Sequence, residues 1–357
     1  MSEDFVTRST LTICLDLRFL NTAFRIGDAL LRYGDIVEPY ETAFNLAFDT
    51  AYDYLRYMVD TENSELCEAM LKHLTFVMSS RNMATRDHDQ DTLANNVISK
   101  ITSQGAEPQN FKIVDMGGGW GHVCVNIAKA IPHTDKKDLP KFVVKDLQKM
   151  IDNGLDQLSE TAEHDKAIID SISFEKYNFI EDINQPDSAD IYMFRFVMHD
   201  WSDSRVITIL KNIVLNMGKD ARIFIMDYII PTQHVFPLVV ERLKRFVNAH
   251  ILATMIVTLT FATRTMDIAA MSILAGKERT EDDWGQLITR FNKENPDTML
   301  GFRLCPHNKF RTDNEPYADN EACTDLKPCT NNELCNRKRA FGVVELKLAS
   351  SSSSDIC

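Results

Sequence analysis

The sequence predicts an α/β fold, with a doubly wound, mostly parallel sheet that follows a helical N-terminal region. Two observations predict it. Over residues 1–105 apolar side chains recur at helical spacing, with no competing strand alternation. From about residue 110 onward, short apolar strands alternate with helical segments, a pattern typical of a parallel sheet covered by helices on both faces.

The helical region contains three groups of apolar residues. The first is Ile13, Leu17, Leu20, Phe24 and Leu31; the second and third span residues 44–58 and 66–78. We expect each group to form the buried face of a helix. The polar stretch 81–92 predicts a loop or a frayed helix end.

The strands of the predicted sheet are short apolar runs bounded by polar residues or glycine. They span residues 111–116, 141–146, 172–174, 189–194 and 221–228, and a final strand spans 341–346. Helices are expected over 123–130 and 203–217, between successive strands. The serine-rich stretch 350–354 predicts a disordered tail.

Composition narrows the class of protein. The 357 residues suffice for two domains, or for one large domain with an appendage. The formal net charge of the chain is −13, whereas nucleic-acid binding needs a basic surface. We therefore expect no nucleic-acid partner.

Cellular location and metal content are predicted from absences in the sequence. The N-terminus lacks a basic start followed by a long apolar run, and the most apolar stretch, 251–262, is too short to span a bilayer. We therefore expect a cytoplasmic protein without a membrane partner, and eight reduced cysteines. Cys323, Cys329 and Cys335 lack the close pairing of zinc ligands, so we expect no metal site.

A glycine-rich turn follows the first predicted strand. Its sequence, DMGGGWG over residues 115–121, lets backbone N–H groups approach a ligand, but it lacks the G-x-G-x-x-G spacing of dinucleotide sites. Asp146 ends the next strand, where a carboxylate can accept both hydroxyls of a ribose. A glycine turn alone is often structural; together with Asp146 it predicts a nucleoside-type cofactor.

A second polar group lies beyond a buried strand, in the sequence RFVMHDWSD over residues 195–203. A lone histidine in a loop is usually a surface residue. At the carboxyl end of a parallel strand, however, His199 would face the ligand cleft and could act as a general base. Asp227 and Glu278 are the acidic residues that could orient it.

Four ordered motifs carry a resemblance to a known family. They are DMGGGWGH at 115–122, HDW at 199–201, DYIIP at 227–231 and KERT at 277–280. Over residues 35–302 the chain resembles the S-adenosylmethionine-dependent O-methyltransferases of the caffeate/flavonoid type, especially their fungal secondary-metabolism branch. The resemblance implies a Rossmann-like class I methyltransferase domain, S-adenosylmethionine as cofactor, and no metal.

The resemblance also assigns site residues. It implies a catalytic set in which His199 deprotonates a hydroxyl and Asp227 and Glu278 flank it. The residues implied for cofactor binding are Asp115, Gly117, Gly119, Asp146, Asn178, Phe179 and Arg195. Gly117 and Gly119 would line the methionine end, and Asp146 would hold the ribose. Asn178 stands where the family usually has an acidic residue at the adenine, and an amide can also hydrogen-bond the ring edge.

The resemblance implies a division of the chain into three parts. Residues 1–105 would form a shortened dimerisation and substrate-lid region, 106–348 the methyltransferase domain, and 349–357 a disordered tail. The implied homodimer would be weakened by the short N-terminus. Segments 247–262 and 305–340 depart from the family pattern and are interpreted either as elaborations or as artefacts of the gene model.

The expected function is transfer of a methyl group from S-adenosylmethionine to a hydroxyl of a small aromatic or polyketide-type metabolite. One alternative is a non-methylating catalyst on the same fold, such as a cyclase, dehydratase or pericyclase. Another is an inactive, truncated homologue. Candidate acceptor-facing residues are Met198, Trp201, Met266 and Met271, although each is equally well interpreted as a core residue.

Overall fold

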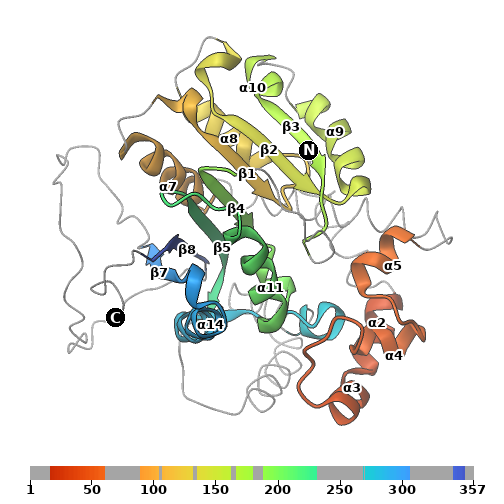
Figure 1. Ribbon diagram of the computed structural model, residues 1–357. Coiled ribbons are helices and arrows are strands. Elements are labelled where there is room, and N and C mark those ends of the chain that lie inside the picture. The colour runs from red at the N-terminus through yellow and green to blue at the C-terminus, as the bar shows by residue number, and fades with distance from the viewer. Residues whose placement is uncertain are drawn as a thin grey trace, which may run out of the picture.

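The computed structural model describes residues 17–60, 89–103, 107–131, 135–161, 166–179, 188–230, 268, 270–305 and 341–349. Within these residues the chain forms an eight-stranded, mostly parallel sheet with helices on both faces (Figure 1). Short N-terminal helices lie together beside one end of this α/β unit. The predicted α/β class is confirmed.

The strands run in the order β3-β2-β1-β4-β5-β8-β7, and the short β6 pairs with β5. Their bounds are β1 Lys112–Met116, β2 Lys141–Asp146, β3 Ile172–Lys176, β4 Ile191–Arg195, β5 Arg222–Ile230, β6 Arg279–Thr280, β7 Leu300–Cys305 and β8 Phe341–Leu348. Strands β1 to β5 are parallel, whereas β8 is antiparallel to both β5 and β7. The order reverses between β1 and β4, and ligands of open α/β sheets bind at such a switch point.

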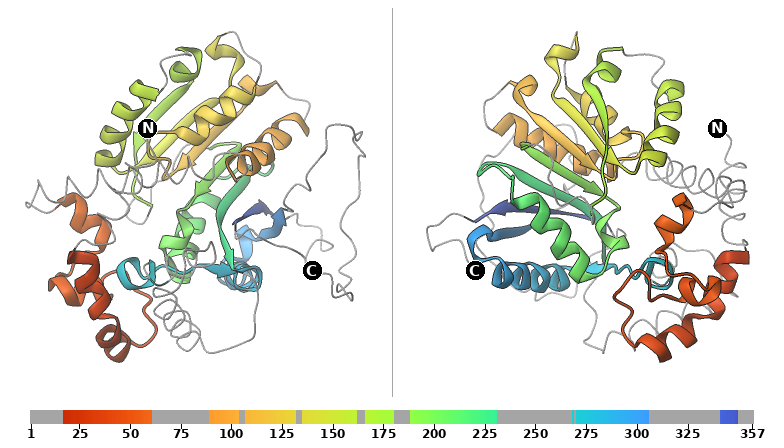
Figure 2. Two further views of the ribbon diagram at one scale, coloured as in Figure 1. Left: turned by 180° about the vertical axis from the view of Figure 1, so that it is seen from behind. Right: turned by 45° about the vertical axis from the view of Figure 1, so that its right-hand side comes forward.

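Two apolar cores cover the two faces of the sheet. Figure 2 shows the helices on these faces from two sides. On one face pack α11 Asp203–Val214 and α14 Glu281–Glu294; on the other pack α7 Asp89–Ser103, α8 His122–Ala130 and α10 Lys166–Ser171. Strand β4 is buried along its whole length, which explains its continuous apolar sequence. The cores hold the strand ends, and therefore the loops beyond them, in fixed positions.

The remaining helix of this unit, α9 Gln148–Thr161, follows β2. It packs closely on the glycine turn, because a Cβ at Gly154 would lie 2.9 Å from the Gly119 carbonyl oxygen. Helix α14 begins at a capping box in which Thr280 and Asp283 each accept a backbone N–H of the other.

The N-terminal helices are α2 Leu17–Phe24, α3 Ile26–Tyr33, α4 Ala43–Phe48 and α5 Tyr54–Asp60. They contact the α/β unit through an apolar cluster in which Ile26, Ala29 and Ala43 pack with Met271 and Ala275. The segment they pack against leads directly into β6.

The prediction that the apolar residues of the first helical group are buried is wrong for two of them. Phe24 and Leu31 are 84% and 89% exposed. The chain breaks between α2 and α3 at Arg25, so the spacing of the apolar residues does not continue along one helix. The side of α3 that is buried carries Ile26 and Ala29 instead.

Most predicted elements are confirmed, with small shifts at their ends. Strand β3 extends to Lys176, and α11 ends at Val214 rather than at residue 217. Residues 89–92, predicted as loop or frayed end, begin helix α7. The apolar group at 66–78, the segment 247–262, nearly all of 305–340 and the serine-rich tail lie outside the described residues.

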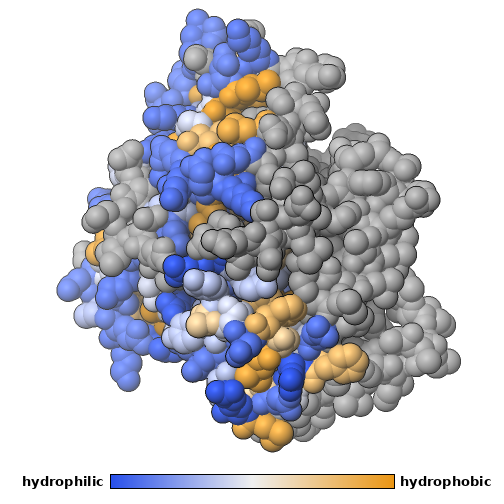
Figure 3. All heavy atoms as spheres, turned by 90° about the vertical axis from the view of Figure 1, so that its right-hand side faces the viewer, coloured by the Kyte–Doolittle hydropathy of each residue, from blue (hydrophilic) through white to orange (hydrophobic). Residues whose placement is uncertain are grey.

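The surface offers no sign of a bilayer-spanning element in the part of the chain that is described. None of the helices described is both long and apolar enough to cross a membrane. On the face in Figure 3, the described residues are mostly hydrophilic, with small separate hydrophobic groups among them.

Candidate functional site

The glycine turn connects β1 to α8 in a conformation that other residues rarely adopt. Gly117, Gly119 and Gly121 have φ angles of 74°, 56° and 78°. A Cβ at Gly117 would lie 2.8 Å from Cγ2 of Val197, whereas a Cβ at Gly119 would have no atom within 4 Å. The turn therefore requires glycine, and it leaves open space at Gly119 for a ligand to approach the backbone.

Asp146 lies against this turn. One of its oxygens accepts the N–H of Gly119 at 2.9 Å, and the other accepts the N–H of Leu147 at 2.7 Å. Burial raises the pKa of Asp146 to about 6, although these two N–H groups act in the opposite direction. The structure thus brings together the glycine turn and the carboxylate predicted to bind a ribose.

Asp115 lies beneath the turn and is 1% exposed. Its Oδ2 accepts a hydrogen bond from the Cys124 thiol at 3.6 Å, and its Oδ1 has no hydrogen-bond partner among the described residues. Burial raises the pKa of Asp115 to about 7. A Cβ at Gly118 would come within 2.6 Å of this carboxylate, so the turn covers it closely.

Arg195 ends β4, and its Nη1 lies 3.1 Å from Nε2 of His122 at the start of α8. Burial, with a smaller effect of Arg195, keeps the pKa of His122 well below its usual value, so this imidazole is neutral and can accept a hydrogen bond from the guanidinium. His122 lies within the motif DMGGGWGH but was not predicted as a site residue. Its position directly after the glycine turn is the signal that could have found it.

Asn178 and Phe179 follow β3, on the same edge of the sheet. A Cβ at Gly117 would lie 3.2 Å from Cζ of Phe179, so the phenyl ring borders the turn. Both side chains are half-buried.

His199 lies in a short 3-10 helix, Met198–Asp200, that follows β4. It is 5% exposed, and its Nδ1 is 2.7 Å from Oε1 of Glu278. A carboxylate at this distance holds the ring with a proton on Nδ1, which leaves Nε2 for proton exchange. The Nε2 atom is 3.6 Å from Oδ1 of Asp200.

Three carboxylates control the protonation of His199. Burial alone would lower the pKa of this imidazole, but Asp200, Glu278 and Asp227 outweigh burial and raise it to about 10. Asp227, near the end of β5, is 2% exposed, and neither of its oxygens has a hydrogen-bond partner among the described residues. Burial raises its pKa to about 7, against the opposing effect of His199.

The three residues predicted as catalytic are therefore in one buried cluster. Asp200, which directly follows His199, lies against this cluster with a partly exposed side chain and was not predicted as a site residue. Burial also raises the pKa of Asp200.

Aromatic rings lie between the two groups. Phe196 has a φ of 53°, its ring is stacked on Tyr228 at 5.4 Å, and the guanidinium carbon of Arg195 lies 4.6 Å from its centroid. The Tyr228 ring centroid is 6.4 Å from that of His199. Phe196 thus connects the end of β4 at the glycine turn with the histidine cluster.

The candidate acceptor-facing residues are mostly in the core. Met198 and Met271 are fully or almost fully buried, and Trp201 packs on the main core while partly exposed. Met266 lies outside the described residues, as do Cys323, Cys329 and Cys335. In the part of the chain that is described, no group of three or more His, Cys, Asp or Glu side chains is arranged to hold a metal ion.

Comparison with known families gives a match over residues 79–291, to the sequence model of the O-methyltransferase domain. Among curated proteins, O-methyltransferase pgmB of Aspergillus terreus (strain NIH 2624 / FGSC A1156) is 28% identical over 269 residues, which are 75% of this chain and 64% of pgmB. O-methyltransferase xanE of Aspergillus fumigatus is 32% identical over 257 residues, 70% of this chain and 47% of xanE. The chain thus spans about half to two thirds of the length of the curated relatives it matches.

Solved structures with the same fold include a methyltransferase and two proteins in complex with SAH or SAM. OxaC in complex with SAH and oxaline has a TM-score of 0.60 at 19% identity, covering 94% of this chain and 65% of OxaC. The mitomycin 7-O-methyltransferase MmcR has a TM-score of 0.60 at 15% identity, covering 96% and 72%. LepI in complex with SAM has a TM-score of 0.59 at 18% identity, covering 96% and 67%.

Proposed function

The chain belongs to the O-methyltransferase domain family, and from this premise we propose that it moves a methyl group from S-adenosylmethionine to a hydroxyl of a small aromatic or polyketide-type metabolite. The observation that carries the proposal is the buried pair of His199 and Glu278, whose Nδ1 and Oε1 atoms are 2.7 Å apart. His199 follows β4, the strand beside β1 and its glycine turn, where open α/β sheets bind their ligands.

The cofactor would be held at the glycine turn. When bound, S-adenosylmethionine supplies a methyl group on a cationic sulfur. The residues present fit such a ligand, because Gly119 has open space beside it and Asp115 has one oxygen without a hydrogen-bond partner among the described residues. Asp146 is fixed by two backbone N–H groups, and its oxygens keep further lone pairs for ribose hydroxyls.

Four more residues complete the proposed cofactor site. Gly117 would line the methionine end; Phe179 borders the same turn, and Asn178 and Arg195 lie at the carboxyl ends of β3 and β4. An amide at Asn178 can donate to or accept from the edge of a purine.

His199 would act as the general base. The neighbouring carboxylates raise the pKa of His199, which favours transfer of a proton from the acceptor hydroxyl to Nε2. Glu278 holds the Nδ1 proton, and Asp227 stabilises the imidazolium that forms. At neutral pH most of the imidazole is already protonated, so we expect turnover to rise toward alkaline pH.

The N-terminal helices would close over the acceptor, as part of a lid within residues 1–105, while residues 106–348 would form the methyltransferase domain. Supporting this, α3 and α4 pack on Met271 and Ala275, just before Glu278. A homodimer through this region is proposed on the exposure of Phe24 and Leu31. Light scattering of the full chain and of a Phe24→Ser, Leu31→Ser variant tests it; localisation of the tagged chain tests the proposed cytoplasmic location.

A second candidate function is catalysis without methyl transfer. A structure described as a pericyclic reaction enzyme has the same fold at a TM-score of 0.59 and 18% identity, so the fold alone does not decide the reaction. The complete set of His199, Asp227 and Glu278 favours methyl transfer, because a base beside an acceptor hydroxyl serves that reaction directly.

Two measurements test the proposal. Calorimetry should detect binding of S-adenosylmethionine to the full chain, and Asp146→Ala should weaken this binding at least about tenfold. Acceptor screening with phenols and polyketides should then yield S-adenosylhomocysteine in proportion to methylated product. Product without S-adenosylhomocysteine would favour the second candidate; a well-folded chain that binds no S-adenosylmethionine would contradict both.

A further inference from the structure

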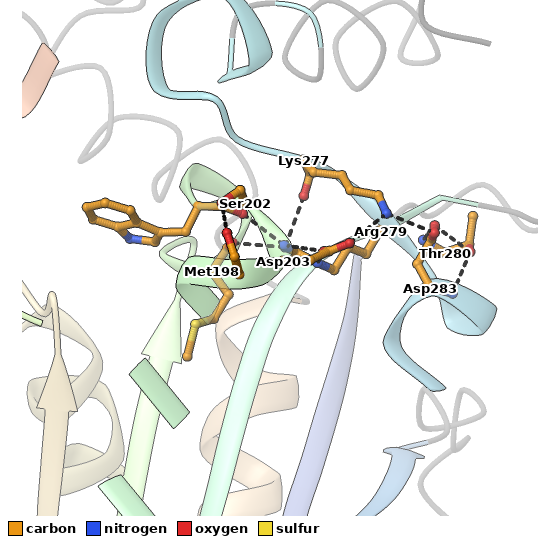
Figure 4. A network of polar contacts seen from close by, with 9 residues as sticks. Met198, Ser202, Asp203, Lys277, Arg279, Thr280 and Asp283 are labelled. Carbon is orange, nitrogen blue, oxygen red and sulfur yellow. Dashed lines mark hydrogen bonds and ion pairs between the residues drawn. The ribbon is translucent and has the colours of Figure 1, made fainter. Parts of the chain in front are cut away.

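Arg279 directly follows Glu278 and is almost completely buried, with a side chain 1% exposed. Its guanidinium donates to three backbone carbonyl groups: Nη1 to Met198 at 3.0 Å and to Lys277 at 3.2 Å, and Nη2 to Trp201 at 2.8 Å. Figure 4 shows the guanidinium reaching from β6 to the loop that follows β4. A buried cation with this many backbone partners holds two segments together.

The charge of Arg279 is balanced at the start of α11. Its Nε donates to Oδ1 of Asp203 at 2.9 Å, and Lys277 lies 3.3 Å from the other carboxylate oxygen. Although burial acts in the opposite direction, Arg279 and Lys277 hold the pKa of Asp203 below its usual value. Asp203 therefore stays ionised, and the guanidinium is fixed in one orientation.

The two carbonyls that Arg279 binds on the loop belong to Met198 and Trp201, which lie on either side of His199. The carbonyl of His199 itself accepts the N–H of Lys277 at 2.8 Å. The backbone around His199 is thus held by residues 277 and 279, while Glu278, between them, holds the imidazole.

We propose that Arg279 is a positioning residue: by holding the carbonyls on both sides of His199, it keeps Nδ1 of the imidazole at hydrogen-bond distance from Glu278. The inference rests on the proposed function, because it assigns Arg279 a part in placing the base. A planar fork with several N–H groups suits this task, whereas a lysine has a single charged nitrogen that cannot reach three carbonyls and Asp203 together.

The test compares Arg279→Lys, which keeps the charge but removes the fork, with the parent chain. Arg290→Lys is the control, because Arg290 lies on the exposed side of α14 and pairs only at the surface with Glu294, at 2.8 Å. The readout is NMR of labelled histidine in the full chain, with the His199 signal assigned from a His199→Gln variant. Calorimetry with S-adenosylmethionine and thermal unfolding report whether the rest of the chain is intact.

We expect Arg279→Lys to bind S-adenosylmethionine within about twofold of the parent affinity. The pH midpoint of His199 should fall by about one unit, because Nδ1 loses part of a charge-assisted hydrogen bond while the local positive charge is retained. With an acceptor in hand, kcat should fall about a hundredfold, the effect of a displacement of about 1 Å. Arg290→Lys should change none of these.

A His199 midpoint that does not move in a folded Arg279→Lys variant overturns the proposal. If that variant does not unfold cooperatively, Asp203→Asn decides, because it removes the carboxylate that fixes the guanidinium; an unchanged midpoint there also overturns it. The NMR readout needs no acceptor, so a shifted midpoint without any methyl transfer would support the role of Arg279 and contradict the proposed function.

Discussion

Glu278→Gln isolates the contribution of one carboxylate to the base. The substitution keeps the shape of the side chain and removes its negative charge. The Nδ1–Oε1 contact of 2.7 Å is buried, and Glu278 is 2% exposed, so water screens this interaction little. Because the carboxylate favours the imidazolium, its removal must lower the pKa of His199.

The size of the change follows from the contact. A hydrogen bond to a charged group contributes about 1.5–3 kcal/mol, and one pKa unit corresponds to about 1.4 kcal/mol, so the pKa of His199 should fall by about one to two units. From a starting value of about 10, the neutral imidazole then becomes the main form at a correspondingly lower pH. The turnover limb that rises with pH should shift to lower pH by the same amount.

The assay is S-adenosylhomocysteine formation across the pH range, with NMR titration of His199 in parallel. The plateau rate should fall about a hundredfold, because the ring loses the partner that orients it. A pH profile and a His199 midpoint that both stay at the parental values would refute this account of the site. A shifted midpoint with an unshifted rate profile would mean that His199 is not the base.

Three further predictions concern the cofactor turn. Asp146→Ala should weaken S-adenosylmethionine binding at least about tenfold by calorimetry, since two charge-assisted hydrogen bonds are lost; retained affinity would contradict the proposed ribose contact. Gly117→Ala should destabilise the fold by about 1–3 kcal/mol in denaturant titration, because of its φ of 74° and the contact with Val197, whereas Gly218→Ala, with nothing within 4 Å, should be neutral. Asp115 binds its proton more tightly in the folded chain, so its contribution to stability is present at acid pH and is lost as pH rises through about 7. The free energy of unfolding should therefore fall by at most about 4 kcal/mol over this range. Asp115→Asn should lack this pH-dependent fall in denaturant titrations.

The sheet could be predicted from the sequence because its strands carry their own signals. Strand β4 is apolar from Ile191 to Phe194 since both its faces are covered, and β1 is followed by glycines whose positive φ angles fit a tight turn. The break between α2 and α3 could not be predicted in this way, because Arg25 is an acceptable helix residue. Phe24 and Leu31 were therefore assigned to a face that the tertiary structure leaves exposed.

The functional site shows the same contrast between what sequence motifs predict and what only the tertiary structure shows. His199 and Glu278 could be predicted as site residues from their motifs. Their contact could not be predicted, because they lie 79 positions apart in the sequence. Asp200 and Arg279 belong to the same motifs and were not assigned, since a charged residue beside a functional one is more often on the surface. Only the placement of β6 against the loop after β4 shows that Arg279 is buried and that Asp200 lies against His199.

The histidine cluster also connects the N-terminal helices to the proposed chemistry. Ala29 and Ala43 pack on Met271 and Ala275, and the chain then turns so tightly that a Cβ at Gly276 would lie 2.4 Å from the His199 carbonyl oxygen. One residue later Lys277 binds that carbonyl. A movement of these helices over an acceptor, as in the proposed lid, would therefore reach the backbone of His199 through this tightly packed segment. On this proposal, closure of the lid would also align His199.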